Sequence, residues 1–329
     1  MILRSHLGII NVLSSNALCI WLLVFSGGCR TLYDFSASVV HNFSTPRAVA
    51  HRVINSPRDS TRLSVVWIGH STVLILIDDK IIITDPWLTN HVGELKNRLT
   101  EPGIDIDSLP SCEIILLSHS HFDHLNLGSL GLIAKRFPEA HLVFPEGLEE
   151  FLPNYSFSLE QMHKPSEKRR EYIGESRLID SVKITTVAAF HWGGRYGLDG
   201  LLWGSEDYTA YIIEYHGLTV YFAGDTGYDD EFFKILGKQY TIDLALVPIG
   251  PCDDPNSIHK QQRHVYPKGA LKIVEDTQAR IMVPIHYGTI YEPLEMYKPR
   301  DVLEDALKSS PDLQAKVRIL EVGELYIVK

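Results

Sequence analysis

One short stretch, His119-x-His121-x-Asp123-His124, constrains what this chain can fold into more than any other feature. It directly follows an apolar run at residues 114–117, which predicts a buried strand. Side chains alternate along extended chain, so the first two histidines point the same way. Three imidazoles and one carboxylate within six residues suit a borderline cation such as zinc. A polar surface loop is the simpler alternative, but the chain has only 15 histidines, so the pattern predicts a metal site.

The composition is that of a globular protein. Apolar residues make up 45% and charged residues 22% of the 329 residues, which allows one large or two ordinary domains with a sizeable core. The net charge of −10 disfavours a nucleic-acid partner, because such proteins present a basic surface. Cys112 and Cys252 lack metal-binding spacing, and we expect buried free thiols there, with one bridge between them as the alternative.

Residues 1–28 have the layout of a secretory signal. Arg4 precedes a compact apolar run at residues 17–25, and Ser26-Gly27-Gly28-Cys29 follows it. A cysteine directly after two glycines resembles the bacterial lipobox, although Ser26 stands where that pattern prefers a leucine-like residue. The resemblance implies that Cys29 is lipidated and becomes the mature N-terminus.

The expected location is therefore the bacterial cell envelope, in the periplasm or at the outer membrane, as an exported, membrane-attached lipoprotein. An uncleaved N-terminal membrane anchor and simple secretion are the alternatives. Residues 29–62 are rich in Ser, Asn and Arg and are expected to form a tether and an N-terminal wrap over the fold. The folded domain is expected to span residues 63–329.

Hydrophobic patterning in this domain predicts many strands and a few helices. Strands are expected at residues 63–68, 72–77, 80–84, 113–117, 141–144, 182–189, 208–215, 219–223, 244–248, 281–284, 317–320 and 325–328. Helices are expected at residues 127–137, 267–277 and 301–308. This order suggests sheets packed face to face with helices outside.

Three further expected strands end in side chains that can bind a metal. His191 follows the strand at residues 182–189, Asp225 lies in Gly224-Asp225-Thr226-Gly227, and His286 follows Pro284-Ile285. A lone strand-end histidine is more often part of a capped turn. Four strands that end in ligand chemistry are harder to explain in that way, because rigid scaffolds present functional residues there.

The complete set, in this order, resembles the metallo-β-lactamase-fold hydrolases over residues 63–329. That resemblance implies an α/β fold, a four-layer αβ/βα sandwich of metallo-β-lactamase type, with a dinuclear metal site along one sheet edge. Further motifs resemble the N-acyl-phosphatidylethanolamine phospholipase D branch and the related bacterial outer-membrane lipoprotein group. These motifs are Trp67-Ile-Gly-His-Ser-Thr72, Thr84-Asp-Pro86, His191-Trp192, Leu202-Trp-Gly-Ser205, Phe222-Ala-Gly-Asp-Thr-Gly-Tyr228, Pro248-Ile-Gly250 and His264-Val-x-Pro267.

The resemblance also assigns roles to the residues. Two zinc ions per chain are implied, the first held by His119, His121 and His191, the second by Asp123, His124 and His286, with Asp225 bridging them. Asp123, Asp225 and His264 are the implied catalytic residues.

We therefore expect a zinc-dependent hydrolase, a phosphodiesterase of phospholipase D type that acts on a membrane phospholipid through a metal-bridging hydroxide. A lactonase or other carbonyl-ester hydrolase on the same dinuclear site is the alternative. In the helix after His264-Val-x-Pro267, this chain has Lys268-Gly269 where the family usually carries acidic residues. The insert at residues 251–262 lacks an apolar lining for a long acyl chain.

For three residues, the sequence allows two interpretations each. His264 resembles the family's substrate-side histidine, which donates a proton to the leaving group or binds phosphate, but it could instead cap the helix that begins at Pro267. His70 and Asp85 could orient metal ligands or simply close turns.

Overall fold

The computed structural model describes residues 45–49, 61–92, 96–166, 170–195, 206–260, 262–291 and 295–329. The expected signal at residues 1–28, Cys29 and most of the tether lie outside the described residues. The short segment around Arg47 does lie over the domain, because its backbone bonds to Leu99 and Glu101 at 2.9 Å each. Among the helices of these ranges, none has the length and apolarity needed to cross a bilayer.

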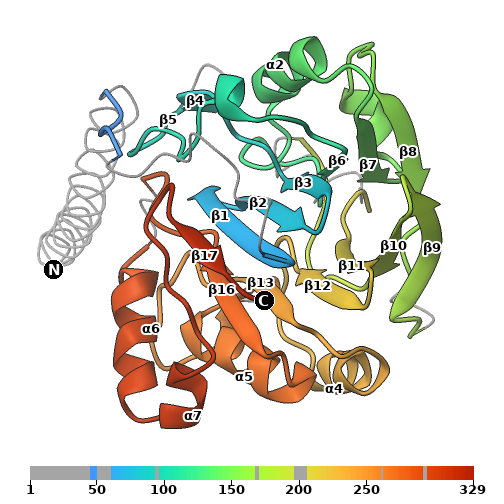
Figure 1. Ribbon diagram of the computed structural model, residues 1–329. Helices are drawn as coiled ribbons and strands as arrows, with labels where there is room; N and C mark the ends of the chain where they lie inside the picture. The colour runs from blue at the N-terminus through green and yellow to red at the C-terminus, as the bar shows by residue number, and fades with distance from the viewer. Residues whose placement is uncertain are drawn as a thin grey trace, which may run out of the picture.

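The architecture is a sandwich of two sheets with helices outside both (Figure 1). The seven-stranded sheet has the order β17-β1-β2-β3-β6-β7-β8. Its strands are β1 (Leu63–Gly69), β2 (Thr72–Ile77), β3 (Lys80–Thr84), β6 (Ile114–Leu116), β7 (His141–Pro145), β8 (Ser158–Met162) and β17 (Leu325–Ile327). The six-stranded sheet has the order β16-β13-β12-β11-β10-β9. Its strands are β9 (Ile173–Ile179), β10 (Val182–Val187), β11 (Ala210–Tyr215), β12 (Leu218–Phe222), β13 (Leu244–Pro248) and β16 (Ile281–Ile285).

The helices form the two outer layers. The first sheet is covered by α2, and the second by the group from α4 to α7 (Figure 1). Their bounds are α2 (Leu127–Arg136), α4 (Asp230–Gln239), α5 (Pro267–Thr277), α6 (Pro299–Lys308) and α7 (Pro311–Gln314). Short elements complete the fold: β4 (His91–Val92), β5 (Lys96–Asn97), β14 (His259–Lys260), β15 (His264–Val265), and the 3-10 turns η1 (Ile106–Ser108) and η2 (Leu148–Phe151).

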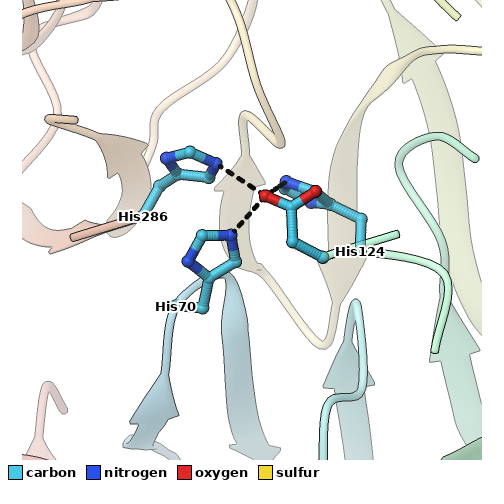
Figure 2. A group of neighbouring side chains, drawn as sticks. His70, His124 and His286 are labelled. Carbon is cyan, nitrogen blue, oxygen red and sulfur yellow. Dashed lines mark hydrogen bonds and ion pairs between the residues drawn. The ribbon is translucent and has the colours of Figure 1, made fainter. Parts of the chain in front are cut away.

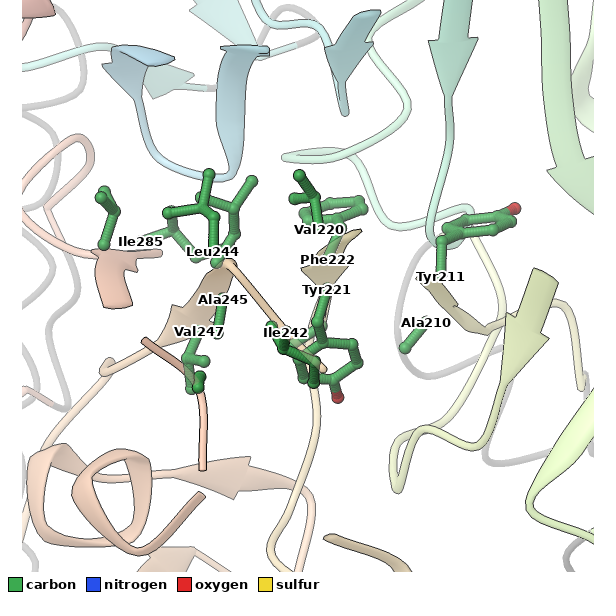
Figure 3. Packing of buried hydrophobic residues seen from close by; sticks show 14 of the residues in the cluster. Ala210, Tyr211, Val220, Tyr221, Phe222, Ile242, Leu244, Ala245, Val247 and Ile285 are labelled. Atoms are coloured by element: carbon green, nitrogen blue, oxygen red, sulfur yellow. The ribbon is translucent and has the colours of Figure 1, made fainter. Parts of the chain in front are cut away.

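The two-residue period of the strands explains why both faces of each sheet are buried. In β1, Val65 belongs to the core between the sheets, whereas Val66 packs in the core under α2. Figure 3 shows the same alternation in β12, where Val220 and Phe222 point to one side and Tyr221 to the other. Strands that are buried on both faces read as continuous apolar runs, which is why they were recognisable in the sequence.

The parallel strands bring their carboxyl ends to one edge. β3 and β6 run parallel, and so do β12, β13 and β16. A bridge between His119 and Tyr208 joins the chain segments of the two sheets at that edge. The loops that leave these strand ends therefore lie at the same edge and carry six of the seven expected ligands. The seventh, His191, follows β10, which runs in the same direction as β12 because both are antiparallel to β11.

The prediction of a strand at residues 317–320 was wrong. Val317 makes one isolated bridge to Met282 beside β16, and the chain then leaves the sheet. The strands β8 and β9 and the helix α4 were not predicted. The thiols of Cys112 and Cys252 are both free and buried, as expected.

Candidate metal centre

The loop that carries His119 to His124 begins directly after β6 and is fixed by two buried side chains. The carboxylate of Asp85 accepts bonds from the backbone N–H and the hydroxyl of Ser118, at 2.7 and 2.6 Å. On the other side, the guanidinium of Arg195 donates to the carbonyl oxygens of Ser120 and Leu125, at 3.0 and 2.5 Å. These hydrogen bonds hold the loop at both ends without a metal ion.

The first cluster contains three histidines from two elements. His121 Nδ1 lies 2.8 Å from His119 Nε2 and 3.3 Å from His191 Nε2. Their potential ligand nitrogens all lie within 4.8 Å of one another. These are the three residues predicted to hold the first metal.

The second cluster contains Asp123, His124 and His286, together with His70. Asp123 Oδ2 lies 3.8 Å from His124 Nε2 and 3.6 Å from His286 Nε2. Figure 2 shows His70, His124 and His286 turned toward a common point. The structure thus adds one imidazole to the three residues expected for the second metal.

Asp225 lies between the two clusters, at the end of β12. Its Oδ2 is 3.1 Å from His286 Nε2 and 3.4 Å from His124 Nε2 on one side, and 3.8 Å from His191 Nε2 on the other. Gly224 makes this placement possible, because a Cβ at that position would lie 2.5 Å from the Cβ of Ser118. All seven predicted ligands therefore meet at one sheet edge.

The outer nitrogens of four histidines have acceptors away from the centre. Nδ1 of His191 faces the Arg263 carbonyl at 3.1 Å, and Nδ1 of His286 faces the Gly250 carbonyl at 3.1 Å. Nδ1 of His119 and Nδ1 of His124 face the Ser118 hydroxyl and the Asp85 carboxylate, at 2.9 and 2.6 Å. Carbonyls and carboxylates only accept, and the Ser118 hydroxyl already donates to Asp85, so each Nδ1 carries a proton and Nε2 is the nitrogen that faces the centre.

Burial keeps the first cluster neutral. It lowers the pKa of His119 and His191 well below the usual value, and that of His121 in the same direction, with the neighbouring histidines adding to the effect for the first two. A neutral imidazole is the form that binds a metal, so the lowered pKa of these three histidines favours metal binding.

The second cluster is electrostatically different. Burial opposes ionisation of Asp225 and Asp123, but the adjacent histidines outweigh it and hold the pKa of both carboxyls well below its usual range. The same carboxylates overcome burial at His124 and raise its pKa well above the usual value. Two carboxylates beside two protonated imidazoles form a charged site in which a metal cation would replace protons.

The residues fit a cation. His124 Nε2, His286 Nε2 and Asp225 Oδ1 are buried polar atoms without a hydrogen-bond partner among the described residues, and all belong to the cluster. Such orphaned atoms are rare in folded proteins and call for an ion or a water. Nitrogen and carboxylate donors in this number suit zinc.

Comparison with known proteins agrees with this geometry. The beta-lactamase superfamily domain family matches residues 80–287. The chain belongs to that family. It is similar to the N-acyl-phosphatidylethanolamine-hydrolyzing phospholipase D 1 of Caenorhabditis elegans, with 27% identity over 80% of this chain and 75% of the relative. It is also similar to a metal-dependent hydrolase of Lysinibacillus sphaericus, with 29% identity over 80% of this chain and 98% of the relative.

Longer relatives and solved structures complete the comparison. The chain is also similar to uncharacterized mycobacterial proteins at 28% identity, and the match spans 66% of the length of those relatives. The structure of Igni18, a metallo hydrolase of Ignicoccus hospitalis, aligns with a TM-score of 0.57 at 21% identity, over 80% of this chain and 97% of that one. This likeness shows the metallo-β-lactamase fold. The chain is a metal-dependent hydrolase of the metallo-β-lactamase superfamily.

In this superfamily member, a histidine and an aromatic residue stand beside the predicted ligands. His264 Nδ1 lies 3.6 Å from Asp225 Oδ2, and its ring contacts the rings of His191 and Trp192 at centroid distances of 4.8 and 5.4 Å. It does not cap α5, because Tyr266 occupies the cap position. The helix-capping alternative for His264 is therefore excluded.

Some functional residues carried no decisive signal in the sequence. The structure settles Asp85, which bonds to His124, and adds Arg195, which follows two glycines in a loop with no recognisable pattern. It also adds Arg263, whose guanidinium lies 5.0 Å from the centre of the Trp192 ring. The motif residues 202–205 lie outside the described residues.

Proposed function

We propose that this hydrolase is a zinc-dependent phosphodiesterase of phospholipase D type. The observation that carries the proposal is that the side chains of His264 and Arg263 both pack against Trp192, next to the predicted ligand His191. The side chains of Asp123 and His264 are 25% and 13% exposed, whereas that of Asp225 is 2% exposed. A substrate would therefore reach the site where Asp123 and His264 are exposed rather than through Asp225.

An anionic substrate suits this approach. The guanidinium of Arg263 is half-buried over Trp192 and has no carboxylate partner among the described residues. An arginine in this state is a good partner for a phosphate, which it can bind with two parallel hydrogen bonds. A neutral lactone has no negative charge for this guanidinium to bind. The name of the worm relative, a phospholipase D that hydrolyses an N-acyl phospholipid, points to the same chemistry.

Two zinc ions per chain are part of the proposal. His119, His121 and His191 would hold one, Asp123, His124 and His286 the other, and Asp225 would contact both. Bound there, the ions would acidify a water and offset negative charge that develops on the substrate. Elemental analysis of protein purified without chelator should give about two zinc ions per chain, the usual dinuclear stoichiometry. One ion or none at saturation would contradict the proposed count.

The proposed reaction is hydrolysis at phosphorus. A water oxygen forms a new bond to phosphorus while the bond from phosphorus to the head-group oxygen breaks. One water proton ends on the departing oxygen, and the other stays on the new phosphate monoester. Burial lowers the pKa of His264 to about 4, so its imidazole is neutral at pH 7. We infer that it assists departure by donating a hydrogen bond to the leaving oxygen, with a proton supplied by water.

Heavy-oxygen labelling tests the bond that is cleaved. In labelled water, a phosphodiester substrate should give a phosphate product that carries one labelled oxygen. Label that enters only a carboxylate would instead establish the lactonase or ester-hydrolase alternative on the same site.

The role of Arg263 is tested separately. Replacing Arg263 with Met should raise KM for an anionic phosphodiester about tenfold or more, because one charge-assisted contact is lost, and leave KM for a neutral lactone unchanged. Lys272→Met is the matched control, since Lys272 lies over the ring of Tyr228 rather than over Trp192. Equal effects of Arg263→Met on both substrates would remove the anion argument.

We also propose that the substrate is a membrane phospholipid and that Cys29 tethers the protein to the envelope membrane. The sequence around residues 17–29 supports this, and a tether raises the local concentration of substrate without further contacts. Wild-type protein should fractionate with membranes and begin at Cys29, and Cys29→Ala should block lipid attachment. Mature protein that retains residues 1–28 would favour the uncleaved anchor. Stable retention requires more than one acyl chain.

A further inference from the structure

His70 occupies a rigid and unusual position beside the second cluster. It follows β1 in the turn to β2 with φ at 55°, in the left-handed region that residues with a Cβ rarely adopt. Its carbonyl accepts bonds from Trp67 Nε1 and from the backbone N–H of His286, at 2.9 and 3.0 Å. Its own N–H donates to Thr289 Oγ1 at 2.6 Å. The backbone is thus bonded directly to the residue that carries a predicted ligand.

The side chain of His70 contacts that cluster too. Nε2 lies 2.9 Å from Asp123 Oδ2, and the ring centre lies 4.1 Å from that of His286 (Figure 2). The residue is 2% exposed. Its Nδ1 is buried and has no partner among the described residues. His70 also lines a cavity of about 10 Å³ with Pro251 and Glu295, which is close to the space that one water needs.

The direction of the hydrogen bond separates His70 from the four histidines that donate through Nδ1. A carboxylate accepts hydrogen bonds and has no proton to donate, so in the 2.9 Å contact with Asp123 Oδ2 the proton lies on His70 Nε2. Its Nε2 lone pair is then not free for a metal, and its Nδ1 faces away from Asp123. In the four others Nδ1 donates outward, so Nε2 is the nitrogen that points at the centre. The arrangement of His70 is that of a group that holds a ligand.

We propose that His70 is a positioning residue that fixes the Asp123 carboxylate for the second metal. Asp123 stands on a loop, its side chain is one-quarter exposed, and the carboxylate could rotate without this bond. The second metal therefore depends on His70. The first does not, because the ring contacts of His70 among the described residues are with Trp87, His124 and His286 and with none of the three histidines of the first cluster. The inference concerns metal binding alone, so it stands or falls independently of the substrate.

The test measures both metal affinities in the full chain. Zinc is titrated against a chromophoric chelator in wild type, His70→Ala and His70→Gln. In His70→Ala the affinity for the second zinc should fall about 10–100-fold, as for other residues that support a metal ligand, while the first is unchanged. His70→Gln should recover part of the loss, because its amide can donate to Asp123. His141→Ala is the matched control, since it removes an imidazole that pairs with Glu160 at 3.1 Å.

Two outcomes would overturn the proposal. One is wild-type affinity for both zinc ions in His70→Ala. The other is nitrogen NMR of the zinc-loaded wild type that shows His70 Nε2 without a proton, since His70 would then be a ligand. A protonated Nε2 supports the positioning role. The NMR measurement needs no variant, so it decides the question even if His70→Ala fails to fold.

Discussion

The Asp85 carboxylate lies 2.6 Å from Nδ1 of His124, although 39 positions separate the two residues in the sequence. The same oxygen accepts the hydroxyl of Ser118, whose oxygen in turn faces Nδ1 of His119 at 2.9 Å. One fully buried carboxylate thus sets the orientation of a histidine in each cluster. Asp85 also has a φ of 33°, a strained conformation that its hydrogen bonds must stabilise.

Replacing Asp85 with Asn should weaken this arrangement without removing a ligand. A neutral amide accepts less strongly from Nδ1, and its own N–H group would face donors. We expect a loss of about 10–100-fold in zinc affinity, measured by chelator competition. Asp78→Asn is the matched control, because Asp78 makes the same bond to the surface residue His216 at 2.9 Å. Equal affinity in Asp85→Asn and wild type would contradict this role.

Asp225→Asn tests the residue between the clusters. An amide offers one oxygen and no charge, so it would contact two dications poorly. The zinc content at saturation should fall from about two to about one per chain, and hydrolysis should be lost with it. The control is Asp243→Asn, a buried carboxylate that pairs with Arg280 at 2.9 Å at the other end of the strands. Full zinc content and activity in Asp225→Asn would remove this residue from the site.

Arg195 should matter for stability as well as for metal binding. Its guanidinium satisfies the carbonyls of Ser120 and Leu125, and its burial leaves little water to replace it. Arg195→Ala should lower the free energy of unfolding by about 3 kcal/mol, the size expected when charge-assisted bonds to buried groups are lost. Urea unfolding of metal-free protein measures this, with Arg136→Ala as control, because the exposed guanidinium of Arg136 also donates to two carbonyl oxygens, at 3.2 and 3.3 Å. A change in the free energy of unfolding below about 0.5 kcal/mol would show that the loop keeps its conformation without Arg195.

Local patterns made much of this architecture predictable. The strands β2, β3 and β13 and the helix α5 have the expected bounds, because apolar runs and a proline at the first helical position are encoded locally. In contrast, β8 and β9 were missed, because they stand at sheet edges and expose polar side chains.

The site divides in the same way. His119 to His124 form one local motif, so their proximity follows from the sequence. His70 and Asp85 could not be decided there, because their partners lie 53 and 39 positions away. A bond of that range depends on which strands are neighbours, and no single stretch of sequence encodes it. Arg195 is the extreme case, since the hydrogen bonds that fix the loop go to carbonyl oxygens, which every residue has.

The metal-free protein should lose stability as the pH rises above neutrality. Burial lowers the pKa of His286, but Asp225 and Asp123 outweigh burial and raise it to about 10. The folded state therefore holds this proton more tightly than the unfolded state, whose histidines titrate near 6.5. The stability from this group is complete below about pH 6.5 and disappears as the pH rises through about 10.

Thermal unfolding of chelator-treated protein between pH 6.5 and 10 measures this loss. His286→Gln should lack that part of the slope, because its side chain does not titrate. Zinc-loaded protein should lack it too, since the ion would replace the proton on Nε2. A melting temperature of the metal-free wild type that stays level or rises across this range would contradict the prediction.

His264→Ala separates the proposed chemistry from metal binding. His264 Nδ1 lies 3.6 Å from Asp225 Oδ2 and the side chain is 13% exposed, so the residue stands beside the predicted ligands where a substrate can reach it. Its removal should lower kcat by roughly 10²–10⁴, the range for a group that assists proton transfer, while zinc content stays at the wild-type level.

The leaving group supplies the decisive comparison for His264. A diester with an acidic phenol as its head group departs without help, so His264→Ala should lose little activity on it and much on an alkyl head group. Equal losses on both would mean that His264 contributes to binding or to the shape of the site rather than to departure. Loss of zinc in the variant would show instead that His264 belongs to the ligand set. His259→Ala is a suitable control, because His259 lies on β14, paired with the strand that carries His264.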